Sequence, residues 1–259
     1  MTDIVLSGKA ISRRFGGVQA LSDVSFSIRR GEIYGLIGPN GAGKTTLFNL
    51  MTGLYAPDSG HFELENRSLD GCKPHEIVRL GLARTFQNIR LFANLSALEN
   101  VMIGRHVRSR AGVIGAVLRN RATRNEEHDI EARALELLEF VGIARQANLP
   151  AGSLAYGDQR RLEIARALAT EPRVLALDEP AAGMNGSETQ ALRTLLKAIQ
   201  GRGVTLLLIE HDVKLVMGIC DRILVLDQGR VIAEGLPAEV QCNPRVVEAY
   251  LGAPAGAAA

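Results

Sequence analysis

The sequence contains no tryptophan, and its aromatic residues make up only 4% of 259 positions. Proteins that bind single-stranded nucleic acid stack bases on exposed aromatic rings, and nucleic-acid binders as a class carry a strong positive charge. Here 30 basic residues face 28 acidic ones, which gives a formal net charge of +2. The composition therefore argues against a nucleic-acid partner.

Cysteine is scarce, and long apolar runs are missing. Cys72, Cys220 and Cys242 lie far apart, in odd number and in no CxxC pair, which favours reduced thiols over a disulfide framework. The longest apolar stretches, such as Val204–Ile209, have the length of a strand, whereas a helix that spans a bilayer needs about 20 residues. The first residues contain no apolar region of signal-peptide length. We therefore expect a soluble, intracellular protein.

Short apolar runs alternate with helical patterns, which is typical of an α/β protein with a mostly parallel sheet. Strands are expected at Val24–Ile28, Ile33–Ile37, Ala83–Phe86, Val174–Leu177, Thr205–Ile209 and Ile223–Leu226. Helices are expected at Lys44–Met51, Ser187–Gln200 and Val213–Cys220.

The stretch from about 95 to 170 is predicted to be mainly helical. Apolar residues recur there at intervals of three and four, as at Ala134, Leu135, Leu138 and Val141. The chain is thus interpreted as a sheet-based core with a helical insertion. One part of the insertion contains Arg105, Arg108, Arg110, Arg119, Arg121 and Arg124, with no acidic residue among them until Glu126. They indicate either a solvated helical hairpin or a surface that faces lipid headgroups or a membrane partner.

A glycine-rich loop reads GPNGAGKT over residues 38–45 and fits G-x-x-x-x-G-K-[ST] between an apolar strand and a helix. The glycines let backbone N–H groups surround phosphate oxygens without interference from a Cβ. The helix that begins near Lys44 adds its positive N-terminal end. We expect Lys44 to reach the β- and γ-phosphates and the Thr45 hydroxyl to bind Mg²⁺.

Two acidic residues end the apolar run VLAL, and a histidine ends the next run. Asp178 is predicted to hold the Mg²⁺, and Glu179 to act as the general base for an attacking water. A histidine after a buried strand is more often structural. If its strand neighbours the VLALD strand, however, His211 reaches the same crevice and can bond the γ-phosphate.

Together these motifs, in this order, resemble the nucleotide-binding subunits of ABC transporters over nearly the whole chain. The resemblance implies a P-loop NTPase (ABC ATPase) core with a mostly parallel sheet, an antiparallel β subdomain and a helical subdomain. It implies one ABC ATPase domain over 1–252, with the helical subdomain at about 95–170 and a C-terminal segment at about 229–252. Residues 253–259 are expected to form a disordered tail.

The resemblance also assigns residues around ATP and Mg²⁺. The aromatic adenine contact falls on Phe15 in RRFGG, and the glutamine that contacts Mg²⁺ and water falls on Gln87 in RTFQN. The phosphate contacts fall on Gly38, Pro39, Asn40, Gly41, Ala42, Gly43, Lys44, Thr45 and Thr46. The implied metal ligands are Thr45, Gln87 and Asp178, and the implied catalytic residues are Glu179, His211 and Gln87.

In this family each ATP also contacts the opposite subunit. The signature motif LSGGQ is matched only in part by LAYGDQ, and the D-loop falls on Ala182–Asn185. The contacts in trans are expected from Leu154, Ala155, Tyr156, Gly157, Asp158 and Asn185. Ala155 replaces the signature serine and Asn185 replaces the D-loop aspartate. Gly157 and the N-terminus of an Arg161–Leu168 helix could still bind phosphate through backbone N–H groups.

Longer strings are similar to the branched-chain amino-acid importer ATPases of the Liv type, among them LAYGDQRRLEIARAL and the closing NPRVVEAYLG. That resemblance implies two transmembrane permease subunits and, indirectly, a periplasmic substrate-binding protein. It implies a second ATPase subunit, either a related chain or another copy of this one. It places the chain in the cytoplasm, peripheral on the inner face of the plasma membrane.

The segment Asn88–Asn100 is the expected dock for the permeases, although its apolar residues Ile89, Leu91 and Phe92 also fit a partly buried core. Other cargoes, such as urea, amides or exported lipid, remain open, because the ATPase sequence carries little information about cargo. A soluble ATPase of the same superfamily, acting on DNA or ribosomes, is disfavoured by the lack of a coiled-coil insertion or a second cassette. A P-loop kinase or GTPase is opposed by LAYGDQ and by the absence of NKxD.

Overall fold

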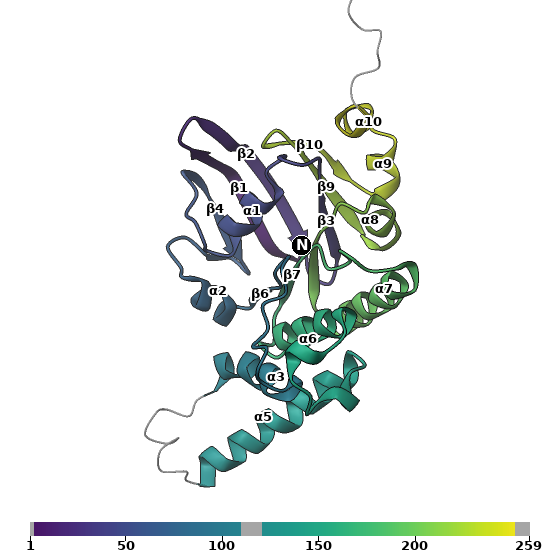
Figure 1. Cartoon of the computed structure of the whole chain (residues 1–259). Coiled ribbons are helices and arrows are strands. Elements are labelled where there is room, and N and C mark those ends of the chain that lie inside the picture. The colour runs from purple at the N-terminus through teal and green to yellow at the C-terminus, as the bar shows by residue number, and fades with distance from the viewer. Residues whose placement is uncertain (1–2, 110–120, 252–259) are drawn as a thin grey trace, which may run out of the picture.

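The computed structural model describes residues 3–109 and 121–251. Figure 1 labels most of the elements. The strands are β1 (Ile4–Phe15), β2 (Val18–Arg29), β3 (Ile33–Ile37), β4 (Ser59–Leu64), β5 (Arg67–Ser68), β6 (Leu82–Arg84), β7 (Val174–Asp178), β8 (Thr205–Ile209), β9 (Arg222–Asp227) and β10 (Arg230–Gly235). The α-helices are α1 (Lys44–Met51), α2 (Pro74–Leu80), α3 (Ala97–Arg105), α5 (Arg121–Phe140), α6 (Tyr156–Leu168), α7 (Gly186–Gly201), α8 (Val213–Ile219), α9 (Pro237–Gln241) and α10 (Pro244–Leu251). Short 3₁₀ turns are η1 (His106–Arg108), η2 (Ala144–Gln146) and η3 (Ala151–Ser153).

The central sheet has the order β10-β9-β3-β8-β7-β6. Strands β9, β3, β8, β7 and β6 pair in parallel, and β10 adds an antiparallel edge. Strands β3, β7 and β8 are buried at every residue, as expected of parallel strands covered on both faces. This arrangement confirms the predicted α/β class with a mostly parallel sheet.

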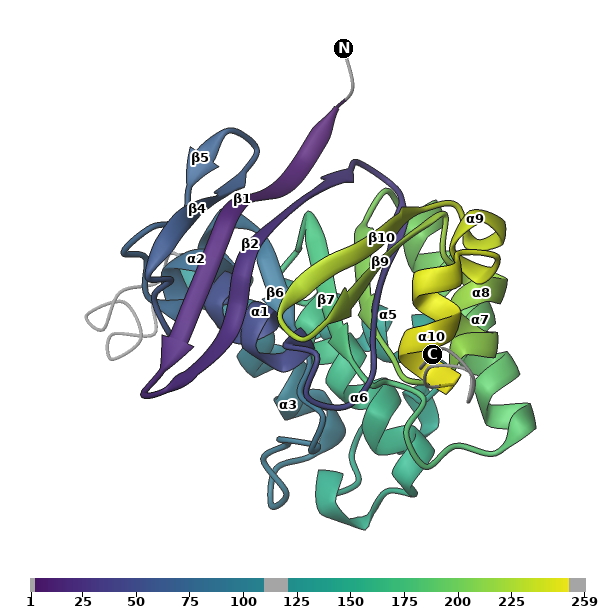
Figure 2. The same cartoon turned by 90° about the horizontal axis from the view of Figure 1, so that it is seen from above.

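Alternate residues of the central strands enter two separate cores. Leu206 and Leu208 of β8 face α7 and α8, and belong to the larger apolar cluster. Leu207 and Ile209 of the same strand face α1 and the second sheet. Figure 2 shows α7, α8 and α9 on one side of the sheet and α1 on the other. The two-residue period of a strand therefore produces a core on each face.

An antiparallel sheet of order β2-β1-β4-β5 closes the second core. Its inward side chains, such as Val24, Phe26 and Phe62, pack against Phe48 of α1. This is the antiparallel β layer implied by the family resemblance. Strand β2 is longer than the predicted Val24–Ile28, because its pairing with β1 extends to Val18 at the hairpin turn.

Within 95–170, the described residues are mainly helical, with α3, α5 and α6 packed on one another at the foot of Figure 1. Ala134, Leu138 and Val141 are buried, as the apolar rhythm predicts. Leu135 was the wrong choice for that face, because it is 41% exposed and Leu137 takes the buried position. The predicted division of the chain into subdomains stays a prediction, and its tail at 253–259 lies outside the described residues.

Several element boundaries differ from the predictions. Strand β6 ends at Arg84 rather than Phe86, because the backbone groups of Phe86 bond to side chains of α6. Helix α6 begins at Tyr156 rather than Arg161, so the signature residues themselves form its first turn.

The arginine-rich segment lies largely outside the described residues. Of its first members, Arg105 pairs with Glu171 at 2.6 Å. Arg108 donates to the backbone carbonyls of Thr170, Arg79 and Glu171. Arg105 thus ties the end of α3, and Arg108 ties η1, to the residues that follow α6. Over the ranges that the structure covers, no helix has the length and apolar character needed to cross a bilayer.

The close packing of α3 on α6 predicts that a side chain larger than glycine at this contact destabilises the protein. A Cβ on Gly104 would lie 2.2 Å from the backbone oxygen of Arg166, whereas one on Gly201 at the end of α7 would meet no atom within 4 Å. We expect Gly104→Ala to lower the free energy of unfolding by about 1–3 kcal/mol. The matched change Gly201→Ala is expected to raise it or leave it within about 1 kcal/mol, because alanine favours helix. Urea denaturation checks both, and equal effects would contradict this packing.

Candidate functional site

The phosphate loop follows the buried strand β3 and runs into α1. Gly38 has φ 153°, and a Cβ there would lie 2.1 Å from the backbone oxygen of Leu226 in β9. Gly41 and Gly43 have φ of 80° and 103°, in the region that favours glycine. The Ala42 N–H donates to Pro39 O, and Ala42 O accepts from Gly229. The loop therefore has a fixed backbone that only glycine permits at Gly38.

Lys44 folds back over this loop and is buried. Its Nζ donates to the backbone oxygens of Gly38 at 2.6 Å and Pro39 at 3.0 Å. Burial lowers the pKa of Lys44, and the nearby carboxylates of Glu179 and Asp178 act in the opposite direction. The following Thr45 is exposed, while Thr46 and Asn40 are half-buried and exposed respectively. The predicted phosphate contacts thus surround the N-terminus of α1.

Asp178 ends β7 and is 5% exposed. Burial raises the pKa of this carboxyl, and the guanidinium of Arg84 opposes that shift. Arg84 is held between the rings of Phe48 and Phe86, 4.3 and 4.6 Å from their centroids, and donates to Thr52 and Asn49. Arg84 was not predicted from the sequence, because a lone arginine at the end of a short strand carries no motif.

Glu179, Gln87 and His211 come together, as predicted. Gln87 Nε2 donates to Glu179 Oε2 at 2.9 Å, and His211 Nδ1 lies 3.6 Å from the same oxygen. Glu179 has φ 46°, and its N–H donates to Ile209 O of β8. This left-handed turn directs the Glu179 side chain toward Gln87. β8 pairs with β7 as anticipated, which explains why His211 reaches Glu179.

Glu210, beside His211, is a further residue that the sequence analysis missed. It is fully buried, and burial raises the pKa of its carboxyl. Its Oε1 accepts from the N–H of Ala181 at 2.8 Å, and its Oε2 from the N–H of His211 at 3.3 Å. Glu210 therefore fixes the backbone that leads from Glu179 toward the D-loop.

Phe15 lies at the end of β1 and is 40% exposed. Its ring meets Tyr55 edge to face, with centroids 5.7 Å apart, and Arg13 lies 4.9 Å over it. Leu21, which is opposite Arg13 in the β1–β2 register, approaches Gly43 of the phosphate loop. The hairpin thus brings an exposed aromatic pair to the vicinity of the loop. Tyr55 was not predicted.

The residues around this loop suit a nucleotide with Mg²⁺. The predicted metal ligands offer a hydroxyl, an amide and a carboxylate, the hard oxygen donors that Mg²⁺ prefers. Gln87 uses its amide nitrogen for Glu179, which leaves its amide oxygen as the ligand atom. The described residues contain no cluster of three His, Cys, Asp or Glu side chains. Such a cluster is not required where phosphate oxygens and water complete the shell.

The residues predicted to act in trans lie at the start of α6 and around the D-loop. Leu154 is buried, Ala155 and Tyr156 are exposed, and Gly157 and Asp158 are half-buried. Ala155 is the N-cap of α6 and offers no side-chain acceptor to the first turn. The N–H groups of Tyr156 and Gly157 therefore point out of the helix start without a side-chain cap, as an anion site requires.

Asn185 has a structural task in this subunit. Its Oδ1 accepts from the N–H groups of Ser187 and Glu188, both at 3.0 Å, and caps α7. The Glu188 carboxylate in turn accepts from the Asn185 N–H. An amide caps as well as a carboxylate, so Asn185 fills the capping role that an aspartate would have at this position.

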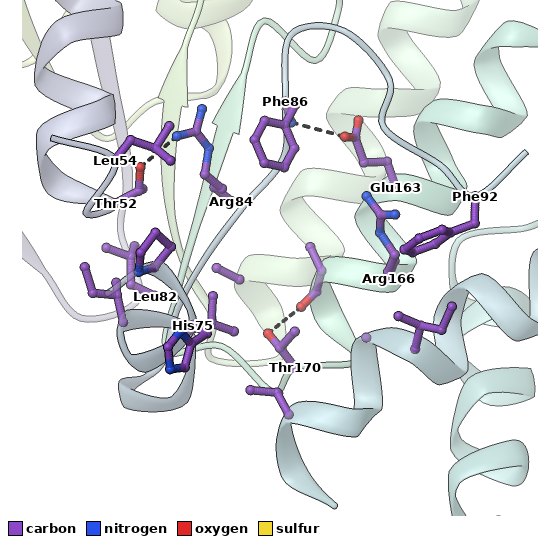
Figure 3. A pocket seen from close by; sticks show the side chains of 18 residues that line it. Thr52, Leu54, His75, Leu82, Arg84, Phe86, Phe92, Glu163, Arg166 and Thr170 are labelled. Atoms are coloured by element: carbon purple, nitrogen blue, oxygen red, sulfur yellow. Dashed lines mark hydrogen bonds between the residues drawn. The ribbon is translucent and has the colours of Figure 1, made fainter. Parts of the chain in front are cut away.

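An apolar pocket of about 390 Å³ lies beside the Gln87 loop, between α2, α3 and α6. Figure 3 shows Phe92 and Arg166 on one wall and Leu54, Leu82 and His75 on the other. Phe92 is 51% exposed, whereas Leu91 is packed against the larger core. The segment Asn88–Asn100 was expected to be either an exposed interface or a partly buried core. Phe92 fits the exposed interface, and Leu91 fits the partly buried core.

The family model for ABC transporters matches residues 21–182, and the model for branched-chain amino acid ATP-binding cassette transporters matches residues 230–256. The chain is 46% identical to the high-affinity branched-chain amino acid transport ATP-binding protein LivG of Salmonella typhimurium. That match covers 97% of this chain and 99% of LivG.

Solved structures give the same result. The crystal structure of the ADP conformation of MJ1267, an ATP-binding cassette of an ABC transporter, superimposes with a TM-score of 0.84 at 32% identity, over 97% of this chain and 100% of that one. The dimeric structure of MJ0796, a bacterial ABC transporter cassette, gives 0.75 at 27% identity, over 90% and 98%. The chain belongs to the family of ABC transporter ATP-binding subunits, within its branched-chain amino-acid group.

Proposed function

We propose that this chain is the ATP-hydrolysing subunit of an importer for branched-chain amino acids, and that it works as a dimer beneath two membrane permeases. The observation that carries the catalytic part is the meeting of Gln87, Glu179 and His211 beside the phosphate loop. Cargo and direction are supported by the similarity to LivG over nearly the full length. They are further supported by the branched-chain family match at the C-terminal end. These matches favour branched-chain amino acids over urea, amides or exported lipid.

Each residue in the cluster has a distinct task in hydrolysis. Glu179 would accept the proton of the attacking water, and the Gln87 amide holds that carboxylate in place. His211 would donate to the γ-phosphate. Lys44 is already buried at the loop, so its positive charge is available to phosphate oxygens without further desolvation. Mg²⁺, held by Thr45, Gln87 and Asp178, would screen the phosphate charge when bound.

We infer dimerisation because the predicted ATP contacts divide into two sets on different elements. Phe15 and the phosphate loop form one half, while the start of α6 and Asn185 form the other. In our proposal, each ATP lies between the loop of one subunit and the signature turn of the other. Stronger contacts with the closed dimer then shift the population toward closure, and hydrolysis reverses the shift. The second subunit is either a related chain or another copy of this one.

The apolar pocket beside the Gln87 loop is our proposed dock for the permeases. Phe92, Leu54 and Ile103 supply its apolar wall, and Arg84 and Arg166 place positive charge beside it. We expect a short cytoplasmic helix of the permease with apolar and acidic side chains to fit there. In this proposal the chain lies on the cytoplasmic face of the membrane, against permeases that receive their cargo from a periplasmic binding protein.

Glu179→Gln tests the general base. The amide keeps the shape of the side chain but cannot take a proton, so we expect kcat for ATP hydrolysis to fall at least about 100-fold while ATP still binds. Phosphate release and calorimetry measure the two effects. Glu171→Gln is the control, because Glu171 also has a positive φ of 51° but pairs with Arg105 away from the cluster. Unchanged phosphate release from Glu179→Gln would remove Glu179 as the base.

Lys44→Ala tests the phosphate loop. Loss of the charged donor is expected to weaken ATP binding at least about tenfold, because hydrogen bonds to charged groups contribute about 1.5–3 kcal/mol. The comparison variant is Lys197→Ala, an exposed lysine of α7 whose Nζ contacts Gln200. Isothermal titration with ATP and Mg²⁺ gives both affinities. An unchanged affinity for Lys44→Ala would refute the loop assignment.

Phe92→Ala tests the permease dock. Tagged protein carrying Glu179→Gln is recovered from detergent-solubilised membranes with ATP and Mg²⁺, and the bound proteins are identified by mass spectrometry. We expect multi-spanning permeases and a second ATPase subunit in the Glu179→Gln sample, and several-fold less permease when Phe92→Ala is added. Leu135→Ala is the control, because Leu135 is exposed on α5 outside the pocket. Equal permease recovery with Phe92→Ala would exclude this dock, and recovery of only ribosomal or DNA-associated proteins would exclude the transporter.

A further inference from the structure

A buried ion pair in α6 is hydrogen-bonded to the loop that carries Gln87. The side chains of Arg160 and Glu163 are 4% and 2% exposed, and their charged atoms lie 3.5 Å apart. Removal of two charges from water is costly unless other hydrogen bonds satisfy them. Here Arg160 and Glu163 form those hydrogen bonds with the backbone of Phe86 and Gln87, just after the end of β6.

Arg160 and Glu163 bond to backbone groups of both Phe86 and Gln87. Arg160 donates to the carbonyl oxygens of Phe86 at 2.9 Å and Gln87 at 2.5 Å. Glu163 accepts from the Phe86 N–H at 3.1 Å, a bond drawn in Figure 3. Since Gln87 Nε2 donates to Glu179, the ion pair determines where the Gln87 amide meets the catalytic carboxylate.

The same arginine is also tied to the signature turn. Tyr156 Oη accepts from Arg160 Nη2 at 2.9 Å and Nε at 3.2 Å. Tyr156, Arg160 and Glu163 are four and three residues apart, so they share one face of α6. Tyr156 is 46% exposed, and the edge of its ring lies 3.4 Å from the position of a Cβ on Gly183 in the D-loop. One end of this chain of contacts is therefore at the surface and the other at Glu179.

We propose that Tyr156, Arg160 and Glu163 are positioning residues that hold Gln87 against Glu179 and make that placement depend on the signature turn. The family motif LSGGQ has glycine where this chain has Tyr156, so the hydroxyl contact belongs to this chain and not to the motif. The inference rests on the proposed function, in which the partner's ATP contacts the signature turn. Binding in trans at α6 then sets the catalytic geometry in cis, through Arg160.

The test compares the variants Tyr156→Phe and Arg160→Lys with the wild-type protein, all as full-length chains. Tyr156→Phe removes only the acceptor oxygen, and Arg160→Lys keeps the charge but cannot bridge two carbonyls and a hydroxyl. We expect each to lower kcat about tenfold, the loss that one charge-assisted hydrogen bond implies. Affinity of the isolated chain for ATP, which depends on the phosphate loop, stays unchanged. Arg161→Lys is the matched control, because Arg161 donates to Val141 O and does not reach the Gln87 loop.

Two further readouts separate positioning from a direct contact between Tyr156 and the partner's ATP. If Tyr156 acts through Gln87, the double variant Tyr156→Phe/Gln87→Ala hydrolyses ATP no more slowly than Gln87→Ala alone. Without nucleotide, amide hydrogen exchange of residues 86–90 is faster in Tyr156→Phe and Arg160→Lys than in wild type, and unchanged in Arg161→Lys.

Additive losses in the double variant, or unaltered exchange in both single variants, would overturn the inference. An unchanged kcat in Tyr156→Phe and Arg160→Lys would do the same and leave the ATPase proposal standing. If the wild-type chain binds no ATP and releases no phosphate, the proposed function itself fails, and the inference falls with it.

Discussion

The parallel pairing of β3, β8, β7 and β6 is the constraint on which the site depends, because carboxyl ends of parallel strands meet at one edge of a sheet. Lys44 follows β3, Glu179 follows β7 and His211 follows β8. Gln87 follows β6 after a short loop. Four residues distant in sequence thus become neighbours without any dedicated binding domain. The cores on both faces of the sheet keep those strand ends in register.

At this edge two adjacent carboxylates are placed in different environments. Asp178 is still part of the buried strand, whereas Glu179 leaves it through a left-handed turn and lies partly in solvent. A non-glycine residue at positive φ costs on the order of 1–3 kcal/mol, which the surrounding structure must supply. The backbone bond from Glu179 to Ile209 and the buried carboxylate of Glu210 fix the chain on either side of that turn. The two neighbouring carboxylates can therefore take the different roles that we propose for them, metal ligand and base.

The sequence predicted those parts of the molecule that local pattern or a motif determines. Features that depend on neighbours along the chain or on strand order could be predicted. They include the phosphate loop, the buried strands β3, β7 and β8, and the meeting of Glu179 with His211. Leu135 was misplaced because a three- and four-residue rhythm does not distinguish it from Leu137. The end of β6 was misjudged because bonds from Phe86 to Arg160 and Glu163, which are distant in sequence, decide where the strand ends. Arg84, Arg160 and Glu163 carry no local signal, since their partners are distant in sequence.

The buried pair in α6 also restricts how related sequences can diverge. A sequence that lost only the carboxylate of Glu163 would leave the guanidinium of Arg160 buried without its counter-charge, and such a loss destabilises by about 3–5 kcal/mol. One that lost only Arg160 would leave a buried carboxylate and two unbonded carbonyls. Either single substitution alone is therefore expected to be selected against, because it destabilises the protein. The two positions are expected to vary as a unit, and Tyr156 with them wherever its hydroxyl is used.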